Sequence, residues 1–187
     1  MKERTSKRIV DSKIINKNAV ANKKIQLITI TAIFAALITI TTAYMIHIPV
    51  PVTGGYIHVG DGIIYIAAAI LPTPYAIIAA VIGAGMADLL TAPMWVIPTI
   101  IIKALITLAF SNKGMKIVSA RNMLATILAL VISTVGYYFA NVFIFGRQIA
   151  IMSSVFGSLI QSVGSAIVFL VIGMALDNMK IKRRFDI

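Results

Sequence analysis

The sequence contains no cysteine, only two histidines and only six acidic residues among its 187 residues. The absence of cysteine excludes disulfide bridges and thiolate metal sites. Charged residues make up 12% of the chain, roughly half of their usual share in soluble domains, whereas apolar residues make up 59%. With a mean hydropathy of +0.96, this composition excludes a soluble globular domain. It predicts an integral membrane protein.

The chain also lacks the motifs that carry common enzyme chemistry. It has no G-x-x-x-x-G-K-[ST] nucleotide loop. It has neither a G-x-S-x-G nor an H-E-x-x-H pattern. Two histidines without a third ligand nearby do not predict a metal site. We therefore expect no catalytic residue, no metal and no cofactor held by this chain, and a binding or transport function rather than a membrane enzyme.

Apolar stretches predict how often the chain crosses the membrane. At about 20 residues per crossing, the length accommodates roughly six helices. The predicted helices cover residues 25–46, 57–71, 75–90, 93–111, 124–144 and 153–178. Pro72 and Pro74 separate the second helix from the third, because proline lacks a backbone donor and disfavours helical geometry at the preceding residue. The alternative is a single kinked helix in their place, which gives five spans.

The distribution of lysine and arginine decides between six and five spans. Of the 17 basic residues, eight precede residue 25, three lie at 113–121 and four at 180–184. Six spans place these 15 residues on one side and only Arg147 on the other, whereas five spans divide the same 16 residues nine against seven. The positive-inside rule favours six. We predict an all-α membrane protein with six transmembrane helices and both termini in the cytoplasm. The net charge of +11 orients these helices in the bilayer and does not indicate nucleic acid binding.

Three regions follow from this topology. Residues 1–24 form a basic cytoplasmic segment without apolar periodicity, which we expect to be disordered or to lie on the anionic inner leaflet. Residues 25–178 form the six-helix membrane domain, and residues 179–187 form a basic cytoplasmic tail. The external connection at 47–59 is rich in proline and glycine and is expected to form an ordered lid, and a second external loop is expected around Arg147.

Polar residues within the apolar stretches are the candidates for a binding site, because such residues cost free energy in a membrane. Lys103 lies near the middle of the fourth helix and needs an anionic partner, either a ligand group or a protein carboxylate, unless it snorkels to the headgroups. Trp95 and Thr99 share its ridge at i−8 and i−4. The alternative for Trp95 is an aromatic anchor at the membrane interface.

Other polar residues extend this candidate site. Asp61 opens the second helix, where it either caps the helix or contacts a ligand. Asp88 closes the third helix against the helix dipole, so it needs a partner such as Lys103 or a ligand donor. Gln161 lies in a stripe of small and polar residues that otherwise resembles a packing surface. The predicted substrate-binding residues are His58, Asp61, Asp88, Trp95, Lys103, Tyr137, Asn141 and Gln161.

Two segments carry a family resemblance. The run GGYIHVGDG at 54–62, followed by the Pro72-Thr73-Pro74 break, and the run IGAGMADLL at 82–90 resemble the S components of energy-coupling factor (ECF) vitamin transporters. The resemblance extends over about residues 25–178 and is strongest to the riboflavin, hydroxymethylpyrimidine and vitamin B6 group. It implies a subunit that captures a vitamin outside the bacterial cell membrane and delivers it by toppling against a membrane coupling (T) subunit driven by two ATPase subunits, which use ATP.

The resemblance also implies a partner interface on the first helix. S components carry an A-x-x-x-A strip there, which Ala32 and Ala36 match, and alanines at this spacing let another helix approach closely. Packing within the chain is the alternative.

The predicted ligand is a small flat ring compound such as hydroxymethylpyrimidine or pyridoxine, with riboflavin or pantothenate as alternatives. A self-sufficient oligomeric carrier is the rival function.

Overall fold

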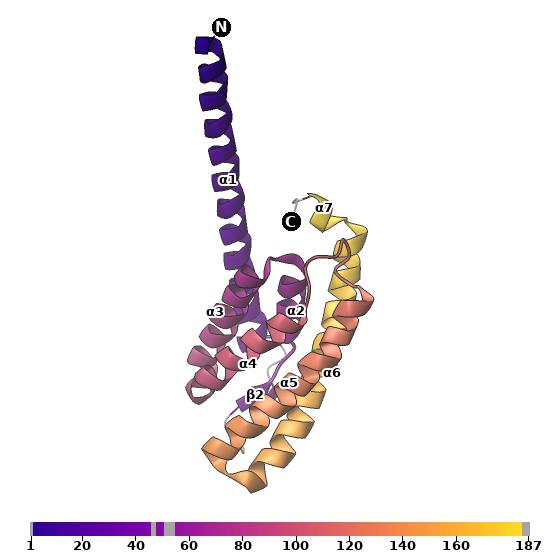
Figure 1. Ribbon diagram of the computed structural model, residues 1–187. Helices are drawn as coiled ribbons and strands as arrows, with labels where there is room; N and C mark the ends of the chain where they lie inside the picture. Colours follow the sequence, from indigo (N-terminus) through magenta and orange to yellow (C-terminus); the bar gives the residue numbers. More distant parts are fainter. Residues whose placement is uncertain (1, 46–47, 51–54, 185–187) are drawn as a thin grey trace. The chain divides into compact units, whose positions relative to one another are not determined.

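The computed structural model describes residues 2–45, 48–50 and 55–184. The chain divides into two units, residues 1–30 and 31–187. Residues 2–30 are helical. The second unit contains a helical bundle and a short hairpin (Figure 1). In chain order, the elements are α1 Lys2–Ala43, β1 Ile48–Val50, β2 Gly55–Ile57, α2 Asp61–Ile70, α3 Thr73–Thr91, the 3₁₀ helix η1 Pro93–Trp95, α4 Val96–Ala109, α5 Ala120–Phe145, α6 Arg147–Asn178 and α7 Ile181–Arg184.

The structure confirms a helical protein with membrane-spanning character. Among the described residues, four helical segments are long and apolar enough to cross a bilayer: Val20–Ala43, Thr73–Thr91, Ala120–Phe145 and Ser154–Asn178. The apolar helices Asp61–Ile70 and Pro93–Ala109 are shorter. Within the predicted lid, β1 and β2 pair antiparallel with Pro49 opposite Tyr56, and residues 47 and 51–54 of the lid lie outside the described residues.

The basic N-terminal segment differs from the prediction of disorder. Residues 2–24 belong to α1, although disorder was one of the two states expected for residues 1–24. The physical reason lies in helix cooperativity, because extending an existing helix costs less than nucleating a new one. Neither proline nor glycine interrupts residues 2–43.

The proline break separates two helices, as predicted. The helix α2 ends at Ile70, and Leu71 takes an extended conformation immediately before Pro72. Pro74 lies in the first turn of α3, where a missing backbone donor costs nothing. The two helices are therefore separate, and the number of spans that they form stays a prediction.

The predicted external loop around Arg147 is wrong. Gly146 alone separates α5 from α6, and Arg147 is the first residue of α6. Gly146 has φ = +86°, a conformation that residues with a side chain rarely adopt, so one glycine reverses the chain.

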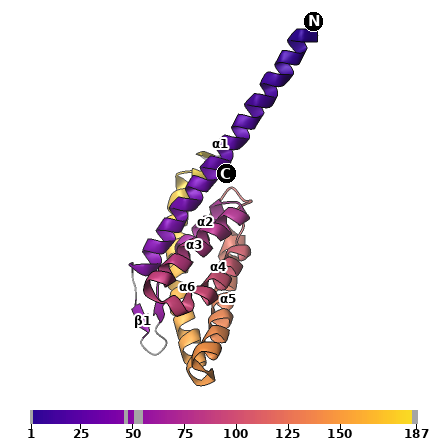
Figure 2. The ribbon, with the colours of Figure 1, turned by 90° about the vertical axis from the view of Figure 1, so that its left-hand side faces the viewer.

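Hydrogen bonds from Lys182 define one end of the second unit. Its Nζ donates to the carbonyl oxygens of Ala69 at 2.8 Å and Asn112 at 2.6 Å, and also to that of Gly114. The C-terminal ends of α2, α4 and α6 therefore lie together, and these helices run in the same direction. The β hairpin and the α5–α6 turn lie at the opposite end, as Figures 1 and 2 agree.

Close packing of α1 on α3 completes the described bundle. A Cβ atom at Gly83 would lie 2.7 Å from the carbonyl oxygen of Ala35 and 2.7 Å from the Cβ of Ile38. Thr39 also donates a 3.0 Å hydrogen bond to the Gly83 carbonyl. The glycine at position 83 is thus required by the approach of the two helices.

Candidate functional site

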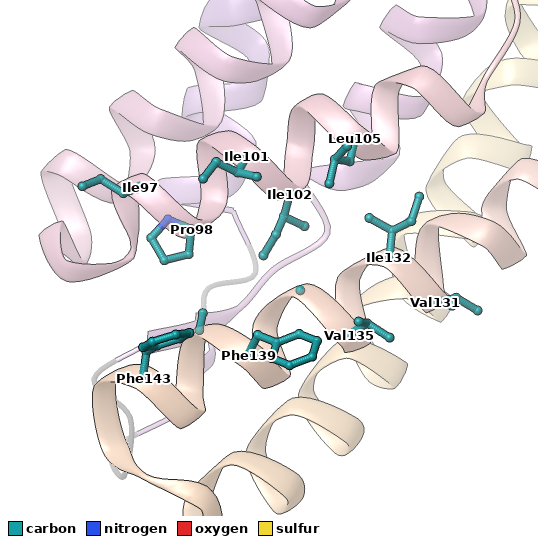
Figure 3. Close-up of a pocket in the computed structure, with 12 residues that line it drawn as sticks. Ile97, Pro98, Ile101, Ile102, Leu105, Val131, Ile132, Val135, Phe139 and Phe143 are labelled. Carbon is teal, nitrogen blue, oxygen red and sulfur yellow. The ribbon is translucent and has the colours of Figure 1, made fainter.

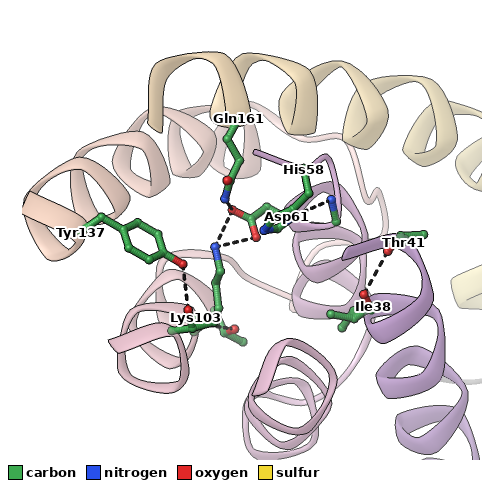
Figure 4. Close-up of polar contacts among 10 residues, drawn as sticks. Ile38, Thr41, His58, Asp61, Lys103, Tyr137 and Gln161 are labelled. Carbon is green, nitrogen blue, oxygen red and sulfur yellow. Dashed lines mark hydrogen bonds and ion pairs between the residues drawn. The ribbon is translucent and has the colours of Figure 1, made fainter. Parts of the chain in front are cut away.

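An ion pair in the bundle interior forms the centre of the candidate site (Figure 4). Lys103 Nζ on α4 lies 2.8 Å from both carboxylate oxygens of Asp61, the first residue of α2. Gln161 on α6 donates from Nε2 to Asp61 Oδ2 at 2.9 Å. Neither charged side chain is exposed. Three helices that are distant in sequence therefore meet at one carboxylate.

This arrangement decides between the alternatives for Lys103. Its partner is a protein carboxylate, that of Asp61, and Lys103 does not snorkel to the membrane surface, since it is fully buried. Asp61 is the first residue of α2, and the N-cap position before it is Gly60, which has no side chain. A buried lysine or aspartate is strongly unfavourable alone, so each compensates the other. Asp88 is buried in the last turn of α3.

Aromatic side chains line the pair on the α5 side. Lys103 Nζ lies 5.3 Å from the centre of the Tyr137 ring, within the range of a cation–π contact. The Tyr137 hydroxyl is 3.2 Å from Thr99 Oγ1. Trp95 packs edge-on against Tyr137 with ring centres 5.9 Å apart, and its side chain is buried. Trp95 is thus an interior residue, and the alternative of an interfacial anchor is wrong.

Asn141 provides a free acceptor one turn beyond Tyr137. Its Nδ2 donates to the Tyr137 carbonyl at 2.9 Å and to Ser154 Oγ on α6 at 3.0 Å. Its Oδ1 is buried and has no hydrogen-bond partner within the part of the chain that the structure describes. A buried acceptor without a partner is costly, so this oxygen is suited to accept a hydrogen bond from a ligand.

His58 shapes the turn that leads into α2. Its ring is buried, and its Nδ1 accepts a 3.0 Å hydrogen bond from the backbone N–H of Gly60. A Cβ atom at Gly60 would overlap Thr42 Oγ1, so glycine is needed there. His58 lies beside Asp61 in Figure 4. The structure thus brings His58, Asp61, Lys103 and Gln161 together at the start of α2.

Two interior residues were missed at the sequence level. Ser154 pairs with Asn141, and only its place in the polar stripe of α6 pointed to it. Tyr65 is fully buried in α2 and stacks on Phe110 with ring centres 4.8 Å apart. The single aromatic residue in an otherwise aliphatic helix was the available signal.

The alanine strip on α1 faces outward. Ala32 and Ala36 are exposed, whereas the neighbouring Ala35 is buried against α3. Within the described residues, packing inside the chain therefore uses Ala35 and leaves Ala32 and Ala36 accessible. Their contact with a partner helix stays a prediction.

An apolar hollow of about 560 Å³ lies between α4 and α5 (Figure 3). Its lining includes Ile97, Ile101 and Leu105 from α4 and Val135 and Phe139 from α5. None of its lining side chains carries a hydrogen-bonding group. A polar ligand would lose its hydration there without compensation, so this hollow is not the candidate binding site.

The fold and the buried ion pair define the class of protein, an integral membrane protein with a polar centre enclosed by apolar helices. The family model described as "ECF-type riboflavin transporter, S component" matches residues 22–178. The chain therefore belongs to the family of ECF-type riboflavin transporter S components, which is a family of transporter components and not of enzymes.

The chain is also similar to a protein of Pyrococcus woesei described as "Uncharacterized protein in gap 3'region". The two are 26% identical over 133 residues, which is 70% of this chain and 88% of the relative. The predicted membership of the S-component family is thus confirmed by the family match.

Proposed function

We propose that this protein is the substrate-binding S component of an ECF importer and that it captures a flat, water-soluble vitamin or vitamin precursor from outside the cell. The observation that carries this proposal is the cluster of Asp61, Lys103 and Gln161 beside Tyr137 and Trp95, in a chain of this family. Aromatic faces with a few fixed polar groups are the usual lining of sites for such ligands.

The proposed topology has six transmembrane helices with both termini in the cytoplasm. Its support is the common direction of α2, α4 and α6, whose C-terminal ends meet at Lys182. The basic residues at 113–121 and 180–184 belong to this same end. By the positive-inside rule this end is cytoplasmic, so the hairpin and Asp61 belong to the external half.

The ligand we favour is a single-ring compound such as hydroxymethylpyrimidine or pyridoxine. The charge of Asp61 is already compensated by Lys103 within the chain, so a neutral ligand is favoured, and Asn141 Oδ1 is among the buried acceptors that remain for it. Riboflavin is the second candidate, because the description of the matching family names it. It would require more polar partners than a single ring.

Delivery in this proposal depends on partner subunits in a bacterial cell membrane. The exposed alanines Ala32 and Ala36 form the surface on which a helix of the membrane coupling subunit docks. Two ATPase subunits bound to that coupling subunit supply the energy, and the S component topples to release the vitamin inside. Copurification with these three subunits is the expected result for the native protein.

The binding test exploits Trp95, the single tryptophan of the chain. Titrating the purified protein with pyridoxine, hydroxymethylpyrimidine and riboflavin should change its tryptophan fluorescence for one of them, because Trp95 packs on Tyr137 beside the ion pair. Pantothenate, which has no ring, is the comparison ligand. Calorimetry on the wild-type protein measures the affinity without relying on the fluorescence of Trp95. If wild-type protein binds none of these compounds, the proposed function is wrong.

A further inference from the structure

A second hollow, of about 520 Å³, lies at the end of the bundle opposite the hairpin. It is formed by the connection between α4 and α5, the last turn of α6 and α7. Four basic side chains line it, together with a single acidic one. These are Lys116, Lys180, Lys182 and Arg183, and Asp177.

The acidic residue offsets only one of the four positive charges, so the lining keeps a net charge of +3. Asp177 accepts hydrogen bonds from the backbone N–H groups of Ile117 at 2.7 Å and Val118 at 2.9 Å. It therefore fastens the α4–α5 connection to the end of α6. Lys182 is buried and directs its Nζ to backbone carbonyl oxygens. Both residues hold the walls of the hollow in place.

The other three cations are available to a ligand. Lys116, Lys180 and Arg183 are exposed, and within the described residues none forms a salt bridge. Lys180 also has φ = +54°, the left-handed conformation that usually selects glycine after a helix end. A lysine held in this conformation at an energetic cost indicates a functional role for its side chain, such as binding a ligand.

The remaining lining is apolar except for Asn178, and it narrows the chemical class of the ligand. Met115, Val118, Met174 and Ile181 lie in the same hollow as the cations. A free phosphate ion has no use for such a surface, whereas a phospholipid presents a phosphodiester next to glycerol and acyl carbons. Basic hollows at the cytoplasmic ends of membrane helices are suited to anionic headgroups.

We propose that this hollow binds the headgroup of an anionic phospholipid, with its phosphodiester between Lys116, Lys180 and Arg183 and its glycerol against Met115 and Met174. The assignment of the site to the inner leaflet rests on the proposed topology. The site is distinct from the vitamin site, since it lies at the other end of the bundle. An ordered lipid there would bridge α7 to the α4–α5 connection.

The test is a titration of the purified protein with dioleoyl phosphatidylglycerol, followed by native mass spectrometry. The variant Lys116→Gln/Lys180→Gln/Arg183→Gln removes the three exposed cations. The matched control, Lys113→Gln/Arg121→Gln/Arg184→Gln, removes the same charge from exposed residues that do not line the hollow. Dioleoyl phosphatidylcholine and inorganic phosphate are titrated in parallel. Melting temperatures without lipid check that both variants are folded.

We expect the first variant to bind phosphatidylglycerol at least about tenfold more weakly, since each basic residue near an anionic lipid contributes roughly a fivefold gain in affinity. The control variant should lose much less. Equal losses in both variants would overturn the proposal in favour of diffuse attraction. Equal affinity for phosphatidylcholine, or displacement of the lipid by inorganic phosphate, would overturn it as well. Vitamin binding is measured in a separate experiment, so a protein that binds no vitamin can still give a clear result for lipid binding.

Discussion

Lys103 Nζ lies 2.8 Å from both oxygens of Asp61, and neither side chain is exposed. The two residues are 42 positions apart in the sequence and come from α4 and α2. Gln161 adds a third helix to the same carboxylate. This contact ties the external half of the proposed topology together, so its removal should affect both stability and binding.

Removing the lysine should destabilise the protein strongly. Lys103→Met leaves Asp61 buried without a counter-ion, which costs about 3–5 kcal/mol in comparable pairs. Asp61→Leu combined with Lys103→Met should recover most of this loss, because two apolar side chains leave no buried charge. Melting temperatures in detergent measure both effects, with the exposed Lys113→Met as control. If Lys103→Met alone is as stable as the wild type, the ion pair does not contribute to the stability of the protein.

Asn141 should contribute directly to ligand binding. Asn141→Ala removes an unpartnered buried acceptor and is expected to weaken vitamin binding at least about tenfold, or on the order of 1.4 kcal/mol. Lys103→Ala should do the same, provided that the variant is folded. Asn178→Ala, an exposed asparagine at the end of α6, is the matched control. Unchanged affinity in both Asn141→Ala and Lys103→Ala would move the site elsewhere.

Substitutions in the alanine strip should affect transport without affecting vitamin binding. Replacing Ala32 and Ala36 with leucine should abolish uptake in cells, because the larger side chains keep a partner helix away. Affinity for the vitamin should not change, since both residues are exposed and distant in sequence from the binding residues. Ala175→Leu, at another exposed alanine, should transport normally. Uptake that survives the double substitution contradicts a role in coupling.

Gly83 should tolerate no side chain. Gly83→Ala places a Cβ atom 2.7 Å from the backbone oxygen of Ala35, so α1 must move away from α3. Overpacking of this kind costs about 1–3 kcal/mol. Gly157→Ala is the control, because a Cβ there meets no atom within 4 Å. A melting temperature of Gly83→Ala equal to that of Gly157→Ala would argue against the close helix contact.

Lys182 should hold the end of the bundle that carries α7. Lys182→Met removes the donor to the carbonyl oxygens of Ala69, Asn112 and Gly114, and leaving the buried acceptor of Ala69 unpaired costs about 1–3 kcal/mol. Because the chain has no cysteine, a single cysteine at Asn112 reports the accessibility of this end without background. Faster labelling is expected in the Lys182→Met background than with the exposed Arg184→Met. Equal labelling rates would exclude the role of Lys182.

Local sequence signals predicted most of the helical boundaries. The apolar stretches located α3, α4, α5 and α6, and the prolines at 72 and 74 separated α2 from α3. These features act through the backbone of a few adjacent residues. The same local reasoning failed at Arg147, because a single glycine with φ = +86° suffices to reverse the chain where a loop was expected.

The amino-acid sequence by itself determined that this chain belongs in a membrane, that it is helical, and which polar residues are too costly to leave without partners there. Only the tertiary structure decided the partners, pairing Lys103 with Asp61 and turning Trp95 inward onto Tyr137. The physical reason is that the free energy of burying a segment depends on the amino-acid composition of that segment. Charge compensation depends instead on contacts between segments, and these contacts form only when the helices pack.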